Sequence, residues 1–151
     1  MHDKKALSRS EMMSRIGPRN TKPEIVIRRG LHAAGFRFRL HRRDLPGTPD
    51  VVLPKHRVVI FINGCFWHRH ESCGHFKLPK TNTDFWEQKI SGNVARDRAA
   101  IEELRKDGWR VLVVWECETR KAALQQLIDE IASWITGNNN EGEIPAPASS
   151  R

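Results

Sequence analysis

The sequence predicts an α/β fold in which helices flank a mixed central sheet. Four segments have the apolar content or the alternation of strands: residues 36–41, 51–53, 57–62 and 109–116. Segments with helical periodicity stand before the first of these strands, between the third and the fourth, and after the fourth. The core order is therefore α-β-β-β-α-β, and three consecutive strands followed by a helical crossover favour a mixed sheet with helices on its faces.

The first helix of this core has a strong start signal, the tetrapeptide TKPE. Thr21 and Glu24 form the pattern of a capping box, and the proline between them is favoured in the first turn of a helix. Gly35 supplies the stop. Apolar residues recur on one face of the segment, at Ile27, Leu31 and Ala34. We therefore expect a helix over residues 21–34.

The strands and the other helices follow from periodicity. In FRFRLH (36–41), apolar residues alternate with cationic ones, as in a half-buried strand with a cationic outer face. RVVIFI (57–62) and WRVLVVWE (109–116) are continuous enough to be buried strands. A long helix is expected over residues 84–106 and an amphipathic helix over residues 119–135. The inward face of the long helix is expected to be Ile90, Val94, Ile101 and Leu104.

Length and composition indicate one domain, since the chain has 151 residues and domains typically have about 100–150. We expect residues 1–136 to form it, with residues 1 to about 20 as an N-terminal segment. Residues 137–151 are expected to be a disordered tail because they have little to bury. The sequence has no signal-peptide h-region and no apolar run of the ~18–20 residues of a membrane span, so it indicates a cytoplasmic protein without a membrane partner.

The charge balance favours a polyanion as partner. Lys and Arg number 26 against 18 acids, for a net charge of +8, and each phosphate that a basic side chain neutralises releases a counterion. A merely basic soluble protein is the alternative, and charge alone does not decide between them. The chain has five Trp and no Tyr, and Trp stacks on bases as well as filling cores, which tips the balance towards nucleic acid.

Cysteine usage points to a metal site rather than to disulfides. Three cysteines are an odd number in a chain expected to be cytoplasmic, and Cys65 and Cys73 lie close together with His70 between them. Cys117 follows the last expected strand, which would bring it to the others if that strand lies beside the one that precedes Cys65. Three thiolates and one imidazole suit a closed, structural Zn²⁺ site. Three buried, inert thiols are the alternative.

A second constellation surrounds the dipeptide PD in LPGTPD. Asp50 stands where a loop enters a strand, and a carboxylate there can hold Mg²⁺ beside a scissile phosphate. The capped helix upstream carries Glu24, and the element order is that of the PD-(D/E)xK nuclease core. A single Asp after Pro is, however, often only a turn residue, and Ile62-Asn63-Gly64 replaces the expected acid-x-Lys. The motif alone leaves the nuclease interpretation open.

Longer motifs, in consistent order over roughly residues 8–120, carry a family resemblance. They are MMSRIGPRNTKPE, LPGTPDVVLP, RVVIFINGCFWHRH, TNTDFWEQKI, NVARDR and GWRVLVVWEC. With these motifs the sequence closely resembles the very-short-patch repair (Vsr) DNA mismatch endonucleases, whose fold is restriction-endonuclease-like. The resemblance implies a DNA-repair enzyme that nicks double-stranded DNA 5′ to the thymine of a T:G mismatch, the lesion left by deamination of 5-methylcytosine. The implied reaction is Mg²⁺-dependent hydrolysis of a phosphodiester bond, which initiates very-short-patch repair.

The resemblance also implies roles for individual residues. Asp50 matches the family's Mg²⁺-binding aspartate. The main-chain carbonyl of Ile62 matches the next metal ligand, a role that needs no acidic side chain. His68 matches the histidine that activates water or assists proton transfer, a task suited to imidazole near neutral pH. Glu24 matches an acid that holds metal-bound water, and it can cap its helix at the same time.

Two positions depart from the family pattern. The family has a histidine where this chain has Asn63, and that histidine pairs with the aspartate matched by Asp97. Asn63 and Asp97 thus occupy the positions of an auxiliary catalytic pair, although asparagine cannot be a general base. The family also has one residue between the zinc-binding histidine and the next cysteine, whereas two residues separate His70 from Cys73.

Further residues are implied to contact the DNA. Phe66, Trp67 and Trp86 match an aromatic trio that wedges into the base stack beside the mismatch. A mismatched step costs only about a few kcal/mol to unstack, and the inserted rings recover stacking energy. Without the resemblance, core packing would be the preferred interpretation of Phe66 and Trp67. The helix of Trp86 and the N-terminal segment supply the other implied contacts: Lys89, Asn93 and Met13.

Two alternatives stay open at the level of the sequence. One is a non-catalytic, zinc-stapled DNA-binding protein, which Asn63 and the missing acid-x-Lys would favour. The other is a related nickase with a different mismatch or site preference. For the mismatch nickase itself we expect a cytoplasmic, nucleoid-associated monomer, with mismatch-repair proteins as candidate partners.

Overall fold

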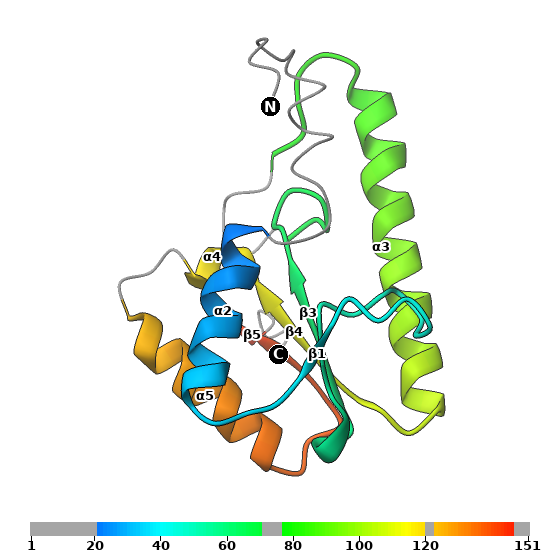
Figure 1. Cartoon of the computed structure of the whole chain (residues 1–151). Helices are drawn as coiled ribbons and strands as arrows, with labels where there is room; N and C mark the ends of the chain where they lie inside the picture. The colour runs from blue at the N-terminus through cyan, green and yellow to red at the C-terminus, as the bar shows by residue number, and fades with distance from the viewer. Residues whose placement is uncertain (1–20, 71–76, 120–122, 147–151) are drawn as a thin grey trace, which may run out of the picture.

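The computed structural model describes residues 21–70, 77–119 and 123–146, which form a central sheet with helices on both faces (Figure 1). The helices are α2 (Lys22–Ala33), α3 (Thr83–Lys106), α4 (Glu116–Thr119) and α5 (Leu124–Thr136), with a 3₁₀ turn η1 (Pro54–His56). The strands are β1 (Arg39–Leu40), β2 (Val51–Leu53), β3 (Val58–Asn63), β4 (Arg110–Trp115) and β5 (Glu141–Ile144). The mixed α/β fold expected from the sequence is confirmed. The N-terminal segment with Met13 lies outside the described residues, as does Cys73.

The sheet has the strand order β1-β2-β3-β4-β5. The neighbours from β1 to β3 are antiparallel, and those from β3 to β5 are parallel. β3 and β4 are in register up to Asn63, which pairs with Trp115, so both strands end at the same edge of the sheet. β2 begins at that edge, because Val51 pairs with Ile60. The start of β2 and the ends of β3 and β4 therefore lie together.

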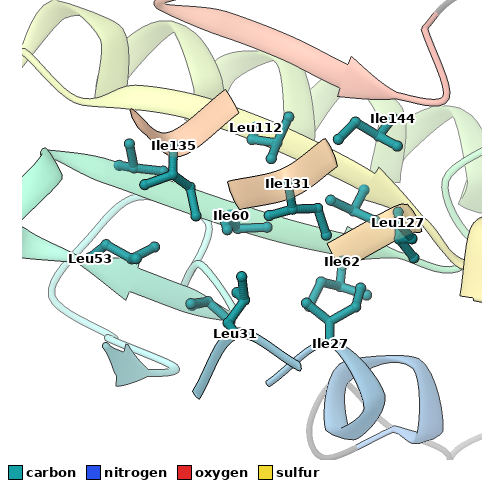
Figure 2. Close-up of a cluster of buried hydrophobic side chains, with 13 residues drawn as sticks. Ile27, Leu31, Leu53, Ile60, Ile62, Leu112, Leu127, Ile131, Ile135 and Ile144 are labelled. Carbon is teal, nitrogen blue, oxygen red and sulfur yellow. The ribbon is translucent and has the colours of Figure 1, made fainter. Parts of the chain in front are cut away.

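Alternation along β3 divides the core between the two faces of the sheet. Val58, Ile60 and Ile62 belong to the cluster under α2 and α5. Val59 and Phe61 belong to the cluster under α3. Figure 2 shows the first cluster, in which side chains of both helices close over the strands: Ile27, Leu31, Leu53, Ile60, Ile62, Leu112, Leu127, Ile131, Ile135 and Ile144. The strands buried on both faces explain the continuous apolar runs of the sequence.

α2 has the boundaries that the sequence predicts. The Glu24 N–H donates to Thr21 Oγ1 (3.5 Å), and the Thr21 N–H donates to Glu24 Oε1 (2.9 Å), which completes the capping box. Gly35, with φ of 96°, follows the end of the helix. Gly30 faces α5, and a Cβ built there would lie 2.4 Å from Cδ1 of Ile128. The close contact of the two helices therefore requires glycine at this position.

α3 is the long helix predicted near residues 84–106, and one inward residue of that prediction is wrong. Ile90, Ile101 and Leu104 are buried, but Val94 is 37% exposed. The amino-terminal half of α3 extends past the sheet (Figure 1) and packs on the loop after β3. Like the other helices of the described ranges, α3 lacks the combination of length and apolar character needed to cross a membrane.

The predicted strand over residues 36–41 is shorter than expected. Only Arg39–Leu40 pairs with β2, and Leu40 is 40% exposed rather than inward. Phe36 and Phe38 still pack on the core, and Arg39 is exposed as the alternation predicts. The ladder stops because His41 has φ of 47°, in the left-handed region, which an extended strand cannot contain.

The prediction of a disordered tail from residue 137 is wrong for residues 141–144, which form β5. This strand pairs with β4 in parallel, and the Val111 N–H donates to the Asn140 carbonyl (2.9 Å). Ile144 is 3% exposed and joins the core. A single apolar residue among polar ones gives no periodic signal, but the open edge of β4 supplies the hydrogen-bonding partners that hold the segment.

Candidate functional site

Three groups of side chains lie where β3 and β4 end. The first is a carboxylate cluster that joins the start of α2 to the start of β2. The second is a Cys-His cluster between the loop after β3 and the turn after β4. The third consists of aromatic and polar side chains shared by that loop and α3. The parallel register of β3 and β4 and the antiparallel pairing of β2 with β3 bring all three to one edge of the sheet.

The carboxylate cluster consists of Glu24, His41 and Asp50, whose ligand atoms all lie within 4.8 Å of one another. His41 Nε2 is 2.8 Å from Glu24 Oε2. The Ile62 N–H donates to Asp50 Oδ2 over 2.7 Å, which fixes this carboxylate at the end of β3. Glu24 is almost fully buried, at 1% exposed. The structure thus brings together Asp50 and Ile62, which the family resemblance implied as metal ligands, and Glu24, which it implied as the holder of metal-bound water.

The two carboxyl groups of this cluster have opposite pKa shifts. Burial raises the pKa of Asp50 to about 8. The hydrogen bond from the Ile62 N–H lowers this pKa, and the nearby charge of Glu24 raises it. Burial also acts to raise the pKa of Glu24, but hydrogen bonds from His41, Thr21 and Asp50 outweigh it and lower the pKa. The pair therefore holds one proton near neutral pH, on Asp50. A bound cation would replace that proton.

His68 lies on a tight turn that begins directly after β3. The His68 N–H donates to the Gly64 carbonyl (3.2 Å), and Arg69 has φ of 60°. His68 Nδ1 is 2.5 Å from Asp97 Oδ2 of α3. Asp97 thus pairs with His68, whereas the family resemblance implied a partner at the position of Asn63. Asn63 itself is buried, at 8% exposed, on the last position of β3.

The Cys-His cluster links the loop after β3 to the turn after β4. His70 Nδ1 is 3.4 Å from Cys65 Sγ and 3.6 Å from Cys117 Sγ, and all three residues are buried. Two ligands of a tetrahedral zinc ion, one S and one N, would be about 3.6 Å apart, so these residues fit three corners of such a site. Trp115 stacks on the His70 ring at 4.2 Å and orients it. The prediction that β4 lies beside β3 and brings Cys117 to Cys65 is confirmed.

Phe66, Trp67 and Trp86 form one aromatic cluster. Their ring centroids lie 5.1–5.8 Å apart, in edge-to-face or tilted contacts. All three are partly exposed, so they belong to neither face of the core. Phe85 extends the cluster, with its ring 5.2 Å from that of Trp86 and 57% of the residue exposed.

Polar side chains of α3 hold the loop that carries Phe66 and Trp67. Asn93 Nδ2 donates to the Trp67 carbonyl (3.0 Å), and its Oδ1 accepts from Arg96 (2.6 Å). Arg69 pairs with Glu87 at 3.1 Å. Lys89, by contrast, is exposed on the helix. Of the two polar α3 residues expected to contact DNA, Asn93 is thus already engaged within the protein.

Sequence reasoning missed His41, Arg69 and Glu87. His41 was placed on the outer, cationic face of a strand, but the ladder ends at this residue and its ring turns to Glu24. The end of the ladder just before a Pro/Gly-rich loop was the signal available. Arg69 and Glu87 are 18 residues apart, and no local pattern links them.

The order of elements, the mixed sheet and the acids at the start of β2 and of α2 define a restriction-endonuclease-like protein. The family model described as "DNA mismatch endonuclease Vsr" matches residues 1–74. The DNA mismatch endonuclease Vsr of Escherichia coli (strain K12) is 43% identical over 147 residues, which cover 95% of this chain and 92% of that protein. The chain therefore belongs to the Vsr family of DNA endonucleases.

Two further relatives bear the name of nicking enzymes. The type II nicking enzyme V.XorIIP of Xanthomonas oryzae pv. oryzae is 47% identical over 126 residues, which cover 80% of this chain and 92% of that protein. The type II nicking enzyme V.NmeAIP of Neisseria meningitidis serogroup A is 45% identical over 128 residues, which cover 82% of this chain and 91% of that protein.

Proposed function

We propose that this endonuclease nicks DNA 5′ to the thymine of a T:G mismatch by Mg²⁺-dependent hydrolysis of one phosphodiester bond, and so initiates very-short-patch repair. The observation that carries the proposal is the Asp50 carboxylate, which is partly buried beside Glu24 and fixed by the Ile62 N–H. The name of the Escherichia coli relative, a DNA mismatch endonuclease, supports the class of substrate.

The oxygen donors of the carboxylate cluster suit Mg²⁺. Asp50 and the main-chain carbonyl of Ile62 would hold the ion, with Glu24 beside them, and Mg²⁺ prefers carboxylate and carbonyl oxygens. When bound, the ion would offset charge on the phosphate and on the leaving 3′-oxygen. The raised pKa of Asp50 fits this role, because a buried acid beside another acid is poorly stable as an anion until a cation arrives.

His68 is the group that moves the proton in this proposal. Because Nδ1 donates to Asp97, Nε2 is the ring nitrogen that can accept a proton from the attacking water. Asp97 fixes the orientation of the ring and stabilises the imidazolium that forms. This arrangement gives Asn63 no proton to transfer, so asparagine at that position is compatible with catalysis.

The aromatic cluster and the zinc site serve recognition. Phe66, Trp67 and Trp86 enter the base stack beside the mismatch, where unstacking is cheapest. Lys89 and Met13 contribute further DNA contacts. A structural Zn²⁺ would be held by Cys65, His70, Cys117 and Cys73. It would make the loop after β3 rigid enough to present the aromatic cluster and His68 to the DNA together. We expect the enzyme to act as a monomer, with mismatch-repair proteins as candidate partners.

A strand-specific nicking assay tests the proposal. The substrates are end-labelled duplexes that differ in one base pair, T:G or a matched pair, incubated with and without Mg²⁺. Asp50→Asn should abolish nicking of the T:G duplex while DNA binding survives. Asp44→Asn is the matched control, because Asp44 lies in the preceding loop and pairs only with Arg42 at the surface. Nicking by the Asp50 variant would refute the assignment.

The relatives named as type II nicking enzymes favour a second candidate, a nickase with another mismatch or site preference. A panel of all single mismatches in several flanking sequences separates the two. The second candidate predicts that the enzyme nicks a duplex of this panel whose mismatch is not T:G. A DNA-binding protein without catalytic activity would leave both strands of every duplex intact.

A further inference from the structure

We propose that His41 is a positioning residue of the nuclease site, which holds the Glu24 carboxylate against Asp50 so that the two acids converge on one cation. This inference rests on the proposed function, because it supplies a partner for Glu24, one of the acids used there. Only 12% of the His41 side chain is exposed, whereas His32 is exposed at the surface.

The β1–β2 ladder places His41 directly opposite Asp50. Leu40 pairs with Val51, so the next pair along the antiparallel ladder is His41 with Asp50. The His41 N–H donates to the Asp50 carbonyl (3.3 Å), which confirms this position. From this position, just past the end of the ladder, the imidazole reaches the Glu24 carboxylate of α2.

His41 completes the hydrogen bonding of a buried glutamate. Oε1 of Glu24 accepts from the Thr21 N–H at 2.9 Å, and Oε2 lies 2.8 Å from His41 Nε2. The Glu24 side chain is 2% exposed, so water does not replace either partner. The Thr21 hydroxyl also donates to Oε1 at 3.3 Å, so Thr21 fixes one oxygen of the carboxylate and His41 fixes the other.

Donation, rather than metal ligation, is the role that fits His41. The imidazole nitrogen nearest the cluster already makes a short contact with Glu24, and the neighbouring donors are oxygens, which Mg²⁺ prefers to nitrogen. Without this donor, Oε2 of the buried Glu24 carboxylate would lose its hydrogen bond to His41, and the carboxylate would be held less firmly beside Asp50. The residue also has φ of 47°, an uncommon conformation for a non-glycine residue that is often found at functional sites.

The test compares His41→Ala with His41→Gln, whose side-chain amide can donate from nearly the position of Nε2. His32→Ala is the control, because His32 is an exposed histidine at the other end of α2. Binding of Mn²⁺ without DNA is followed by electron paramagnetic resonance, and nicking is measured in single-turnover reactions with saturating DNA. His41→Met, which keeps volume without a donor, replaces the alanine variant if that variant unfolds at the assay temperature.

We expect the alanine variant to have about 10–100-fold lower affinity for Mn²⁺ and an about 10–100-fold lower rate of nicking. Effects of this size are usual when a metal-site residue loses its hydrogen-bond partner. The glutamine variant should recover most of both, and DNA affinity should be the same in all variants. Wild-type Mn²⁺ affinity in the alanine or methionine variant would overturn the proposal. A glutamine variant as weak as the alanine one would also overturn it, since it would show that the imidazole itself is required. The Mn²⁺ measurement needs no substrate, so it decides the role of His41 even if the wild type fails to nick a T:G duplex.

Discussion

Asn93 of α3 and Trp67 of the loop after β3, 26 residues apart in the sequence, are joined by a hydrogen bond of 3.0 Å from the Asn93 side-chain amide to the Trp67 carbonyl. This bond fixes the backbone of the loop between Cys65 and His70, its two residues in the Cys-His cluster. The loop is therefore held in place before any DNA arrives.

Asn93→Ala should loosen the loop in the DNA-free protein. We expect faster hydrogen exchange of the amides of residues 66–68, and about tenfold lower nicking of the T:G duplex, because displaced aromatic rings and His68 meet the mismatch less often in the right geometry. Gln88→Ala, at an exposed position of the same helix, is the control. Unchanged exchange in the Asn93 variant would mean that the residue acts only through contact with DNA.

The raised pKa of Asp50 makes stability depend on pH in Mg²⁺-free buffer. The carboxyl has a pKa of about 8 in the folded protein and 3.8 ordinarily, so between these values the folded state binds more protons than the unfolded state. The free energy of unfolding should therefore fall as the pH rises from about 4 to about 8. Asp50→Asn removes this dependence, and at pH 9 it should be more stable than the wild type by on the order of a few kcal/mol.

Thermal denaturation of both proteins at pH 5 and pH 9 checks this prediction. The difference in Tm should be large at pH 9 and small at pH 5, and Mg²⁺ should raise the Tm of the wild type alone. Asp44→Asn, which removes an exposed carboxylate, should show no such trend. An equal difference at both pH values would contradict the assignment of the buried proton to Asp50.

Loss of the zinc ion proposed at the Cys-His cluster should disorder the loop after β3 while leaving the carboxylate cluster intact. Cys117→Ala, purified and analysed for metal, should lose about one equivalent of zinc, as expected when a closed four-ligand site loses a thiolate. We also expect a lower Tm and weaker binding of T:G duplexes, with Mn²⁺ binding at the carboxylate cluster unchanged. A zinc content equal to that of the wild type would remove Cys117 from the site.

Arg110 stabilises the fold at the end of the sheet opposite the site. Its guanidinium lies over the Trp134 ring, 4.8 Å from the centroid. It donates at 2.8–3.0 Å to four carbonyls around the end of α5: Trp134, Ile135, Gly137 and Asn139. Arg110→Met should cost about 2–4 kcal/mol in urea denaturation, because carbonyls lose a charged donor. Nicking at a temperature where the variant is folded should be unchanged.

Arg98→Met is the matched control for this prediction. Arg98 forms only an exposed ion pair with Glu141 at 3.5 Å, and such pairs contribute about 0–1 kcal/mol. Equal losses in the two variants would show that the carbonyl contacts of Arg110 contribute little.

The sequence signals that proved reliable are local. The capping box of Thr21 and Glu24 places the start of α2, since both residues act within one helical turn. The β-branched runs of β3 and β4 identify buried strands, and their parallel pairing then follows from the helix between them. The same pairing predicts that Cys65 and Cys117 meet. For such elements, interactions between residues close together in the sequence are enough to decide the local structure.

The features that escaped prediction depend on partners far along the chain. His41 contacts Glu24 across 17 residues and turns inward only because the β1 ladder ends at its left-handed backbone. β5 has one buried apolar residue, Ile144, and forms because β4 offers an unpaired edge. Asp97 accepts from His68 rather than serving the position of Asn63, which depends on how α3 crosses the loop. None of these partners is visible in a local pattern.

The outer strands of the sheet carry a last consequence. Within the described residues, β1 has two residues and β5 has four, and β5 bears Glu141 and Glu143. A long, flat, uncharged edge strand can pair with a strand of another copy, whereas short edge strands that bear carboxylates resist such pairing. Enzyme molecules bound close together on one stretch of DNA should therefore not aggregate by pairing their edge strands.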